Sequence, residues 1–285
     1  MTKLRSLRSK SLAVAFIFML GFALFYILPF GASLAYSLFD DTRLRGFAGL
    51  ANYVSVLKNP YFQLALKNTM VFTVISVPLL IVLALAAACI LVVALRYTIG
   101  RHLQSVVLMP ILLPSAALVV FWRLAFGDSS GLGDMPGEFG QAARLTAPVY
   151  AFFLWKNIGL AAIILMGAIV RIPPDIYEAA QIDGAGGFRK HMSITLPMIG
   201  PVMFFCMILG VVQSFKVYKE VFLLYGSYPH ESLYTMQHYI NNKFLKLDYP
   251  ELSAAAALFM AAIFLLIGAL FLIRIAVGKE RHDAR

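Results

Sequence analysis

Residues Glu178 to Pro197 read EAAQIDGAGGFRKHMSITLP, a polar, glycine-bearing stretch between two long apolar runs. The Glu178–Ala180 triplet is expected to open a short helix. Gly184 is expected to end that helix, because glycine accepts backbone conformations that other residues avoid. Ile194–Pro197 then leads into the next apolar run. A short polar helix placed between two apolar runs favours a docking element over a catalytic site.

Composition sets the class of protein to which this stretch belongs. Of the 285 residues, 61% are hydrophobic and only 13% are charged, and the mean hydropathy is +0.81. A soluble domain is far less apolar than this, so the chain must be solvated by lipid. An all-α membrane protein is predicted, since helices satisfy every backbone polar group in hydrocarbon and the alternation of barrel strands is absent.

Six apolar runs are long enough to cross a bilayer, whose core needs roughly 20 residues of helix. They cover approximately residues 12–39, 70–95, 103–126, 148–170, 201–225 and 252–277. No linker or second domain is evident, so residues 1–285 are expected to form a single transmembrane domain. The external segment 46–69 mixes Gly, Asn and Pro with amphipathic pieces and is expected to hold one or two short surface helices.

The distribution of Lys and Arg predicts the orientation. Basic residues gather in the tail 1–11, between spans two and three, in the loop 171–199 and after span six, and these segments lie on one side if the spans number six. The positive-inside rule makes that side cytoplasmic, together with both termini. The net charge of +10 therefore reports topology rather than nucleic-acid binding.

The first span and the two cysteines have simple interpretations. The first apolar run is too long for a cleaved secretory signal, so we expect a retained helix. Cys89 and Cys206 fall inside spans, where free thiols behave as small apolar residues, and no disulfide is expected.

The spacing EAA, three residues, Gly, nine residues, I-x-L-P resembles the signature loop of permease subunits of bacterial ATP-binding-cassette importers. Gly49-Leu50-Ala51-Asn52-Tyr53 is similar to the G-L-x-N-Y element of the sugar-importing permeases. Within that superfamily, Ile182–Ala185 and Ile194–Pro197 look like the maltose, oligosaccharide and glycerol-phosphate branch. The resemblance implies a multi-pass subunit of the bacterial inner membrane that forms half of a pathway for a carbohydrate.

The resemblance also implies that this loop is a coupling helix, which transmits movement from an ATPase to spans four and five. The residues carried over are Glu178, Ala179, Ala180, Asp183, Gly184 and Ala185, with Phe188 and His191 as further contacts. His191 stands where many sugar permeases have an aromatic residue, so docking contacts are expected to shift by a turn toward Phe188. Asp175 is a candidate helix cap, and Glu178 is expected to favour the helix dipole.

The partners implied are a homologous second permease subunit, two ATP-binding-cassette ATPase subunits, an external solute-binding protein and the carbohydrate. The chain lacks a G-x-x-x-x-G-K-[ST] phosphate loop, so it is not expected to be an enzyme. No cofactor or metal is expected on this chain, because ATP and magnesium are used by the partner subunits.

Polar residues within the spans are costly in lipid and indicate a face turned toward the bundle or toward water. The candidates for contact with the solute are Gln213, Ser214, Lys216, Tyr218, Trp155, Lys156, Asn157 and Trp122. The structural alternative is that Lys216 and Glu220 form an i,i+4 pair and that the aromatic residues belong to the interface belt. An excess of cations near the outer half would suit an anionic saccharide or a phosphodiester.

Two other classes of protein were compared with the importer permease. An ion-coupled secondary transporter would show repeated halves and broken helices with mid-membrane carboxylates; only Glu220 comes near such a carboxylate, and no repeat is evident. A membrane-embedded enzyme would need a catalytic constellation, and the sequence has no HExxH, no GxSxG and no clustered His-Asp set within the spans.

Overall fold

The computed structural model describes residues 15–40, 45–95, 97, 99–126 and 138–283, and its ordered elements are helices. The sole β contact among these residues is an isolated bridge between Phe39 and Phe47. In chain order the elements are η1 (Ala23–Ile27), α2 (Leu28–Tyr36), α3 (Ala51–Lys58), α4 (Pro60–Ala94), α5 (Ile99–Leu112), α6 (Ser115–Phe126), α7 (Glu138–Val170), α8 (Pro174–Ile182), α9 (Gly187–Lys190), η2 (His191–Thr195), α10 (Leu196–Phe215), α11 (Tyr218–Tyr225), η3 (Glu231–Leu233), α12 (Met236–Leu245) and α13 (Tyr249–Asp283).

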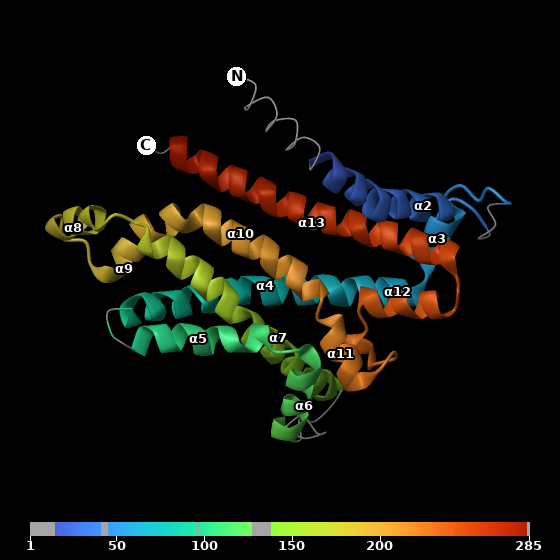
Figure 1. The fold of residues 1–285 in the computed structure, drawn as a ribbon, viewed down its shortest axis with the longest axis horizontal. Helices are drawn as coiled ribbons and strands as arrows, with labels where there is room; N and C mark the ends of the chain where they lie inside the picture. Colours follow the sequence, from blue (N-terminus) through green and yellow to red (C-terminus); the bar gives the residue numbers. More distant parts are fainter. Residues whose placement is uncertain (1–14, 41–44, 96, 98, 127–137, 284–285) are drawn as a thin grey trace. The chain divides into compact units, whose positions relative to one another are not determined.

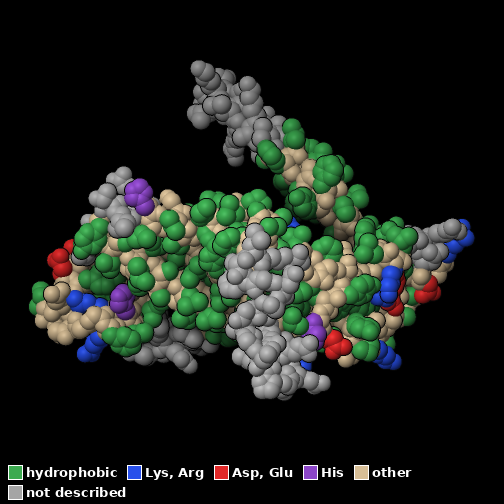
Figure 2. All heavy atoms as spheres, turned by 90° about the horizontal axis from the view of Figure 1, so that it is seen from below, with side chains coloured by type: hydrophobic (Ala, Val, Ile, Leu, Met, Phe, Trp, Pro, Cys, Tyr) green, Lys and Arg blue, Asp and Glu red, His purple; other side chains and the backbone are tan. Residues whose placement is uncertain are grey.

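The all-helical membrane class is confirmed. Within the described residues, five helical segments are long and apolar enough to span a bilayer: Ala15–Tyr36, Pro60–Ala94, Leu145–Val170, Gly187–Tyr225 and Tyr249–Ile275. Hydrophobic side chains also dominate the face drawn in Figure 2, where Lys, Arg, Asp and Glu are few. The second span begins earlier than residue 70. The segment 46–69, which was predicted to lie on the surface, contains α3 and also the first turns of α4.

The third predicted span, 103–126, is not one straight helix. His102–Leu112 and Ser115–Trp122 meet at an angle of 97° and count as a sixth span only if the bent pair is taken together. The break falls at Leu113 and Pro114, because proline lacks an N–H and disfavours helical backbone in the residue before it. Figure 1 shows α6 turning away from the line of α5.

The described chain divides into two compact units, one drawn from residues 1–63 and 239–266 and the other from 64–238 and 267–285. In the second unit, α7 packs between α5 and α10, as Figure 1 shows. The core where α4, α7 and α10 meet is rich in small side chains, including the fully buried Ala84, Ala88 and Ala162. Small residues allow membrane helices to approach closely, which is the main source of their packing energy. Cys89 and Cys206 are both free, as expected.

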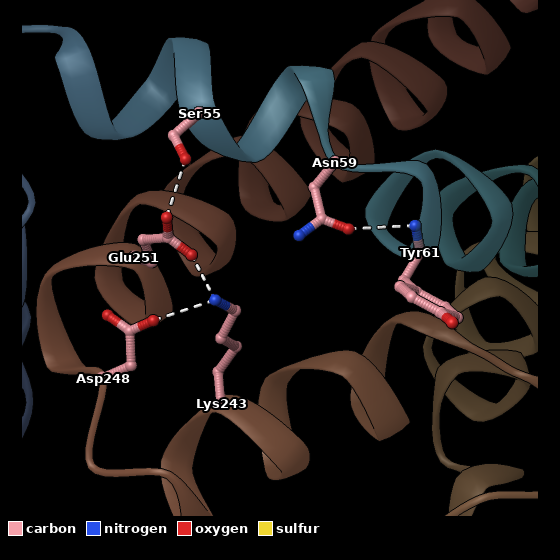
Figure 3. A network of polar contacts seen from close by, with 6 residues as sticks. All are labelled: Ser55, Asn59, Tyr61, Lys243, Asp248 and Glu251. Carbon is pink, nitrogen blue, oxygen red and sulfur yellow. Dashed lines mark hydrogen bonds and ion pairs between the residues drawn. The ribbon is translucent and has the colours of Figure 1, made fainter.

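The first unit contains a polar network, drawn in Figure 3, that joins α3 to α12 and the start of α13. Lys243 donates to Asp248 Oδ2 at 2.8 Å and also bonds with Glu251, while Ser55 donates to Glu251 Oε1 at 2.7 Å. On the adjoining turn, the backbone N–H of Tyr61 donates to Asn59 Oδ1 at 2.9 Å. Burial by itself lowers the pKa of Lys243, but the bonds with the two carboxylates outweigh burial and raise it above its usual value.

Candidate functional site

The loop between α7 and α10 folds into two short helices, α8 and α9, that lie beyond the ends of α7 and α10 (Figure 1). Helix α8 begins at Pro174, four residues before Glu178, so the expectation that Glu178 opens it is wrong. Pro173 occupies the N-cap position and Pro174 the first turn, where a missing N–H costs nothing. Asp175 lies in the first turn and no side-chain cap bond is present, so it favours the helix dipole instead of capping.

Gly184 ends α8 through two backbone hydrogen bonds. The N–H of Ala185 donates to Ala180 O at 2.9 Å, and the N–H of Gly184 donates to Gln181 O at 3.1 Å. Gly184 has a φ of +78°, in the left-handed region. This arrangement is a Schellman motif, in which glycine supplies the left-handed residue without a Cβ penalty. The glycine spacing therefore fixes the angle at which the chain leaves α8.

The surface of α8 and α9 is open. Glu178, Ala179, Asp183, Gly184 and His191 are all exposed, whereas Ala180 and Ala185 are partly buried by the turn. Large apolar side chains are also exposed here, and the most exposed are Ile182 at 88% and Phe188 at 77%. They lie at the ends of the Schellman turn on a segment that is otherwise polar. Exposed apolar side chains on a polar, well-formed loop are typical of a protein-binding surface.

The loop is anchored to the bundle at one side. Tyr177 of α8 shares a hydrogen bond of 2.8 Å with Thr195, a buried residue at the end of η2. Lys190 donates to Gln181 at 3.1 Å and so links α9 to α8. The Tyr177–Thr195 bond therefore connects α8 to the residue directly before α10.

A second group of predicted residues meets at a small cavity in the other half of the same unit. The cavity has a volume of about 20 Å³, enough for one or two water molecules. It is lined by Phe152, Phe153, Lys156, Asn157, Gln213, Lys216, Val217 and Glu220. Lys156, Asn157, Gln213 and Lys216 were all candidates from the sequence, and the fold brings them together from α7 and the end of α10.

An ion pair closes one side of this cavity. Lys156 of α7 lies 2.5 Å from Glu220 Oε1 of α11, and their side chains are 18% and 7% exposed. Ser115, the first residue of α6, accepts from Lys156 at 2.8 Å and donates to Glu220 Oε1 at 2.9 Å. The group therefore joins three helices. In low-dielectric surroundings such a pair persists only when its remaining polar atoms are bonded, as Ser115 allows.

The predicted alternative pair between Lys216 and Glu220 is wrong, because the helix does not continue between these residues. Lys216 is the C-cap of α10, and α11 begins at Tyr218. Glu220 instead bonds across to Lys156 and Ser115. Sequence reasoning missed Ser115 completely, and the only signal for it was its position directly after Pro114, at the start of a broken span.

The remaining candidates have structural contacts. Ser214 is buried and shares a 2.9 Å bond with Thr73 of α4, while Asn157 donates to the carbonyl of Phe153 at 2.8 Å. Trp122 and Trp155 lie beside each other, with ring centroids 5.9 Å apart. Tyr218 packs edge-on against the ring of His238. Trp155 is the more exposed tryptophan, at 36%, so it offers an aromatic face close to Lys156 in the chain.

No group of three or more His, Cys, Asp or Glu side chains in the described part of the chain is arranged to hold a metal ion. The geometry instead offers two separate features: an exposed, well-ordered turn beyond one end of α7 and α10, and a polar cavity between their other halves. The first is an exposed surface connected to α10, and the second is a polar space of the size of a water molecule.

Comparison with known proteins supplies the context for these features. No protein-family model matches the chain. The trehalose/maltose transport system permease protein MalF of Thermococcus litoralis is 31% identical over 277 residues, covering 91% of this chain and 90% of that protein. The sn-glycerol-3-phosphate transport system permease protein UgpA of Yersinia enterocolitica is 27% identical, with 86% of each chain covered.

Two further matches agree with these. The sulfoquinovosyl glycerol transport system permease protein SmoG of Agrobacterium fabrum is 27% identical over 79% of this chain and 76% of that protein. Among solved structures, a chain of a bacterial ABC transporter involved in the import of the acidic polysaccharide alginate has a TM-score of 0.70. It is 23% identical, and the match covers 98% of this chain and 99% of that one, which shows a shared fold.

Proposed function

The chain belongs to the permease subunits of ATP-binding-cassette sugar importers, and from this premise we propose that it forms half of a transmembrane pathway for a carbohydrate. A homologous permease would supply the other half of the pathway. Two ATPase subunits and an extracytoplasmic solute-binding protein complete the proposed assembly, which lies in the cell membrane. The chain itself is not the enzyme of this assembly.

The observation that carries the proposal is the Schellman turn at Gly184, flanked by exposed Ile182 and Phe188. We assign this surface, with Glu178, Ala179, Ala180, Asp183, Ala185 and His191, to contact with an ATPase subunit. The left-handed glycine fixes where the two apolar side chains point, and the Tyr177–Thr195 bond connects them to α10. Closure of the ATPases would thus move the cytoplasmic ends of α7 and α10 and give alternating access.

The cavity beside α11 is the proposed solute-contacting part of this chain. Gln213, Lys216, Lys156 and Asn157 line it, and Trp155 and Trp122 offer aromatic faces that suit the C–H faces of a sugar ring. Ser214 and Tyr218 support this region from α10 and α11. Polar side chains in a membrane span are expensive unless they serve a pathway or a partner, which favours this assignment.

Substitution at Gly184 tests the coupling assignment. An added Cβ meets no atom within 4 Å at Gly184 or at Gly186, but only Gly184 has a positive φ. Gly184→Val should therefore distort the turn, while Gly186→Ala should leave it intact. We expect Gly184→Val to abolish solute uptake and reduce the amount of ATPase that copurifies, with normal membrane insertion, whereas Gly186→Ala behaves as wild type. Wild-type uptake by Gly184→Val would refute the assignment.

Gly184→Asn distinguishes the effect of the turn geometry from the effect of the surface that contacts the ATPase. Asparagine tolerates the left-handed conformation better than other non-glycine residues, so the turn should persist while a polar side chain projects from it. Loss of ATPase copurification in this variant would show that the surface itself is the contact. Retention of both uptake and copurification would show that only the turn geometry matters.

A further inference from the structure

The cavity beside α11 has an unequal balance of charge. Among the residues that the structure describes, three charged side chains line it: Lys156, Lys216 and Glu220. Lys156 and Glu220 form the 2.5 Å ion pair described above, and Ser115 bonds with both of them. These two groups therefore neutralise each other, and one positive charge is left over.

That charge is the ammonium of Lys216. The side chain is exposed, and no ion pair involving it is present among the residues that the structure describes. Lys216 is the C-cap of α10, so the partial negative charge of a helix end favours the lysine there without cancelling its full unit of charge. An ammonium inside a span does not face lipid tails, and the cavity is the polar space that it borders.

The neighbouring lysine provides a contrast. Lys219 is also exposed, but it is not among the residues that line the cavity. Of these two exposed lysines, only Lys216 therefore borders the proposed pathway. The neutral lining residues Gln213 and Asn157 add hydrogen-bonding groups and no further charge.

We propose that the solute carried by this permease bears a negative charge, a carboxylate or phosphate on a sugar or polyol, and that Lys216 is the residue that selects it. This inference rests on the proposed function as an importer permease. Lys156 is a positioning residue in this scheme, because its ammonium already forms an ion pair with the carboxylate of Glu220. A neutral sugar gains only hydrogen bonds at the cavity, whereas an oxyanion also gains a charge-assisted bond, which is roughly twice as strong.

The test is uptake by the complete transporter in proteoliposomes with its solute-binding protein. The probes are two matched pairs: digalacturonate against galactobiose, and sn-glycerol-3-phosphate against glycerol. We expect wild type to import one of the anions, and the pair that responds identifies carboxylate or phosphate as the recognised group. Lys216→Gln should raise the KM for that anion about tenfold, the usual loss for one charged hydrogen bond. Lys216→Arg should restore uptake, and Lys219→Gln should match wild type.

The binding protein is the same in every arm, so its own selectivity cancels between variants. Preferential import of galactobiose or glycerol by wild type would overturn the charge inference while leaving the importer function intact. Equal effects of Lys216→Gln and Lys219→Gln would do the same. Should Lys216→Gln fail to assemble, competition between the paired probes for wild-type uptake still decides, because the anion must inhibit at the lower concentration. Absence of uptake of both anions would overturn the charge inference, whereas the importer function is tested separately, by the copurification of ATPase subunits with the chain.

Discussion

Breaking the Lys156–Glu220 pair should loosen the contact among α6, α7 and α11. The loss of stability should depend on which of the two residues is replaced. Removing one member of a buried pair typically costs about 3 to 5 kcal/mol, because the other charge is left without compensation. Glu220 is 7% exposed and its two-carbon stem is too short to carry the carboxylate to water, so Lys156→Met should approach the lower end of that range, about 3 kcal/mol.

Glu220→Gln should cost less. Lys156 is 18% exposed, its long stem can carry the ammonium toward water, and the amide oxygen of Gln still accepts from Ser115. We expect about 1 to 2 kcal/mol, the range of a single lost hydrogen bond to a charged group. The double variant Lys156→Met/Glu220→Gln removes both charges and should cost less than the two single variants added together, since neither charge is then left buried without compensation.

Hydrogen exchange measured by mass spectrometry on the assembled transporter in nanodiscs is a suitable assay, because amide exchange reports local opening free energies. A cost of about 3 kcal/mol corresponds to exchange more than one hundred times faster for the α11 amides. Lys219→Met is the matched control and should leave exchange unchanged. Costs of the two single variants that simply add in the double variant would show zero coupling and refute the argument.

Two further predictions concern other parts of the same unit. His238 is fully buried and its Nδ1 accepts from the backbone N–H of Thr235 at 3.2 Å, and burial lowers the pKa of His238 to about 4. The folded state holds His238 in its neutral form, so its free energy of unfolding is highest above pH 6.5 and falls as pH drops toward 4, by about 2 kcal/mol between pH 6.5 and 5. Hydrogen exchange of the amides of α12 should show this dependence on pH, and His238→Asn should abolish it. Gly159→Ala should destabilise the α5–α7 contact by about 1 to 3 kcal/mol, since the new Cβ would collide with the carbonyl of Val107. Gly167→Ala, where nothing lies within 4 Å, should leave the melting temperature unchanged or raise it, and equal melting temperatures for the two variants would contradict the packing argument.

Hydropathy was sufficient to predict the helical membrane class, because hydrocarbon admits few other backbone arrangements. It did not reveal the 97° break at Pro114, since a bent pair and a straight helix have the same apolar content. The pattern of glycines predicted the end of α8 correctly, through the left-handed requirement at Gly184. The start of that helix was misplaced where the Glu178–Ala180 triplet was expected to open it, because Pro174 occupies the first helical turn, a position that proline favours.

The charged residues show more clearly what the sequence could not predict. Sequence spacing placed Lys216 and Glu220 one helical turn apart, and only the tertiary fold reveals that the chain breaks between them. The partner of Glu220 lies 64 residues earlier in the chain, on α7, and Ser115 lies 105 residues earlier. Local periodicity carries no information about pairs at such separations, so the ion pair required the structure.

The π-helical turn η2 has a consequence for insertions and deletions. His191–Thr195 holds one more residue per hydrogen-bonded turn than an α-helix would, and it lies directly between the loop helices and α10. Deleting a single residue within it would let the turn relax to ordinary α-helix while the segment on its amino-terminal side keeps its rotational position about the axis of α10, whereas a deletion within α10 itself would rotate that segment by about 100°. The residue that η2 holds in excess can therefore be lost without changing the face that α8 presents, which makes this turn the one place between the loop and α10 where a change of chain length is tolerated.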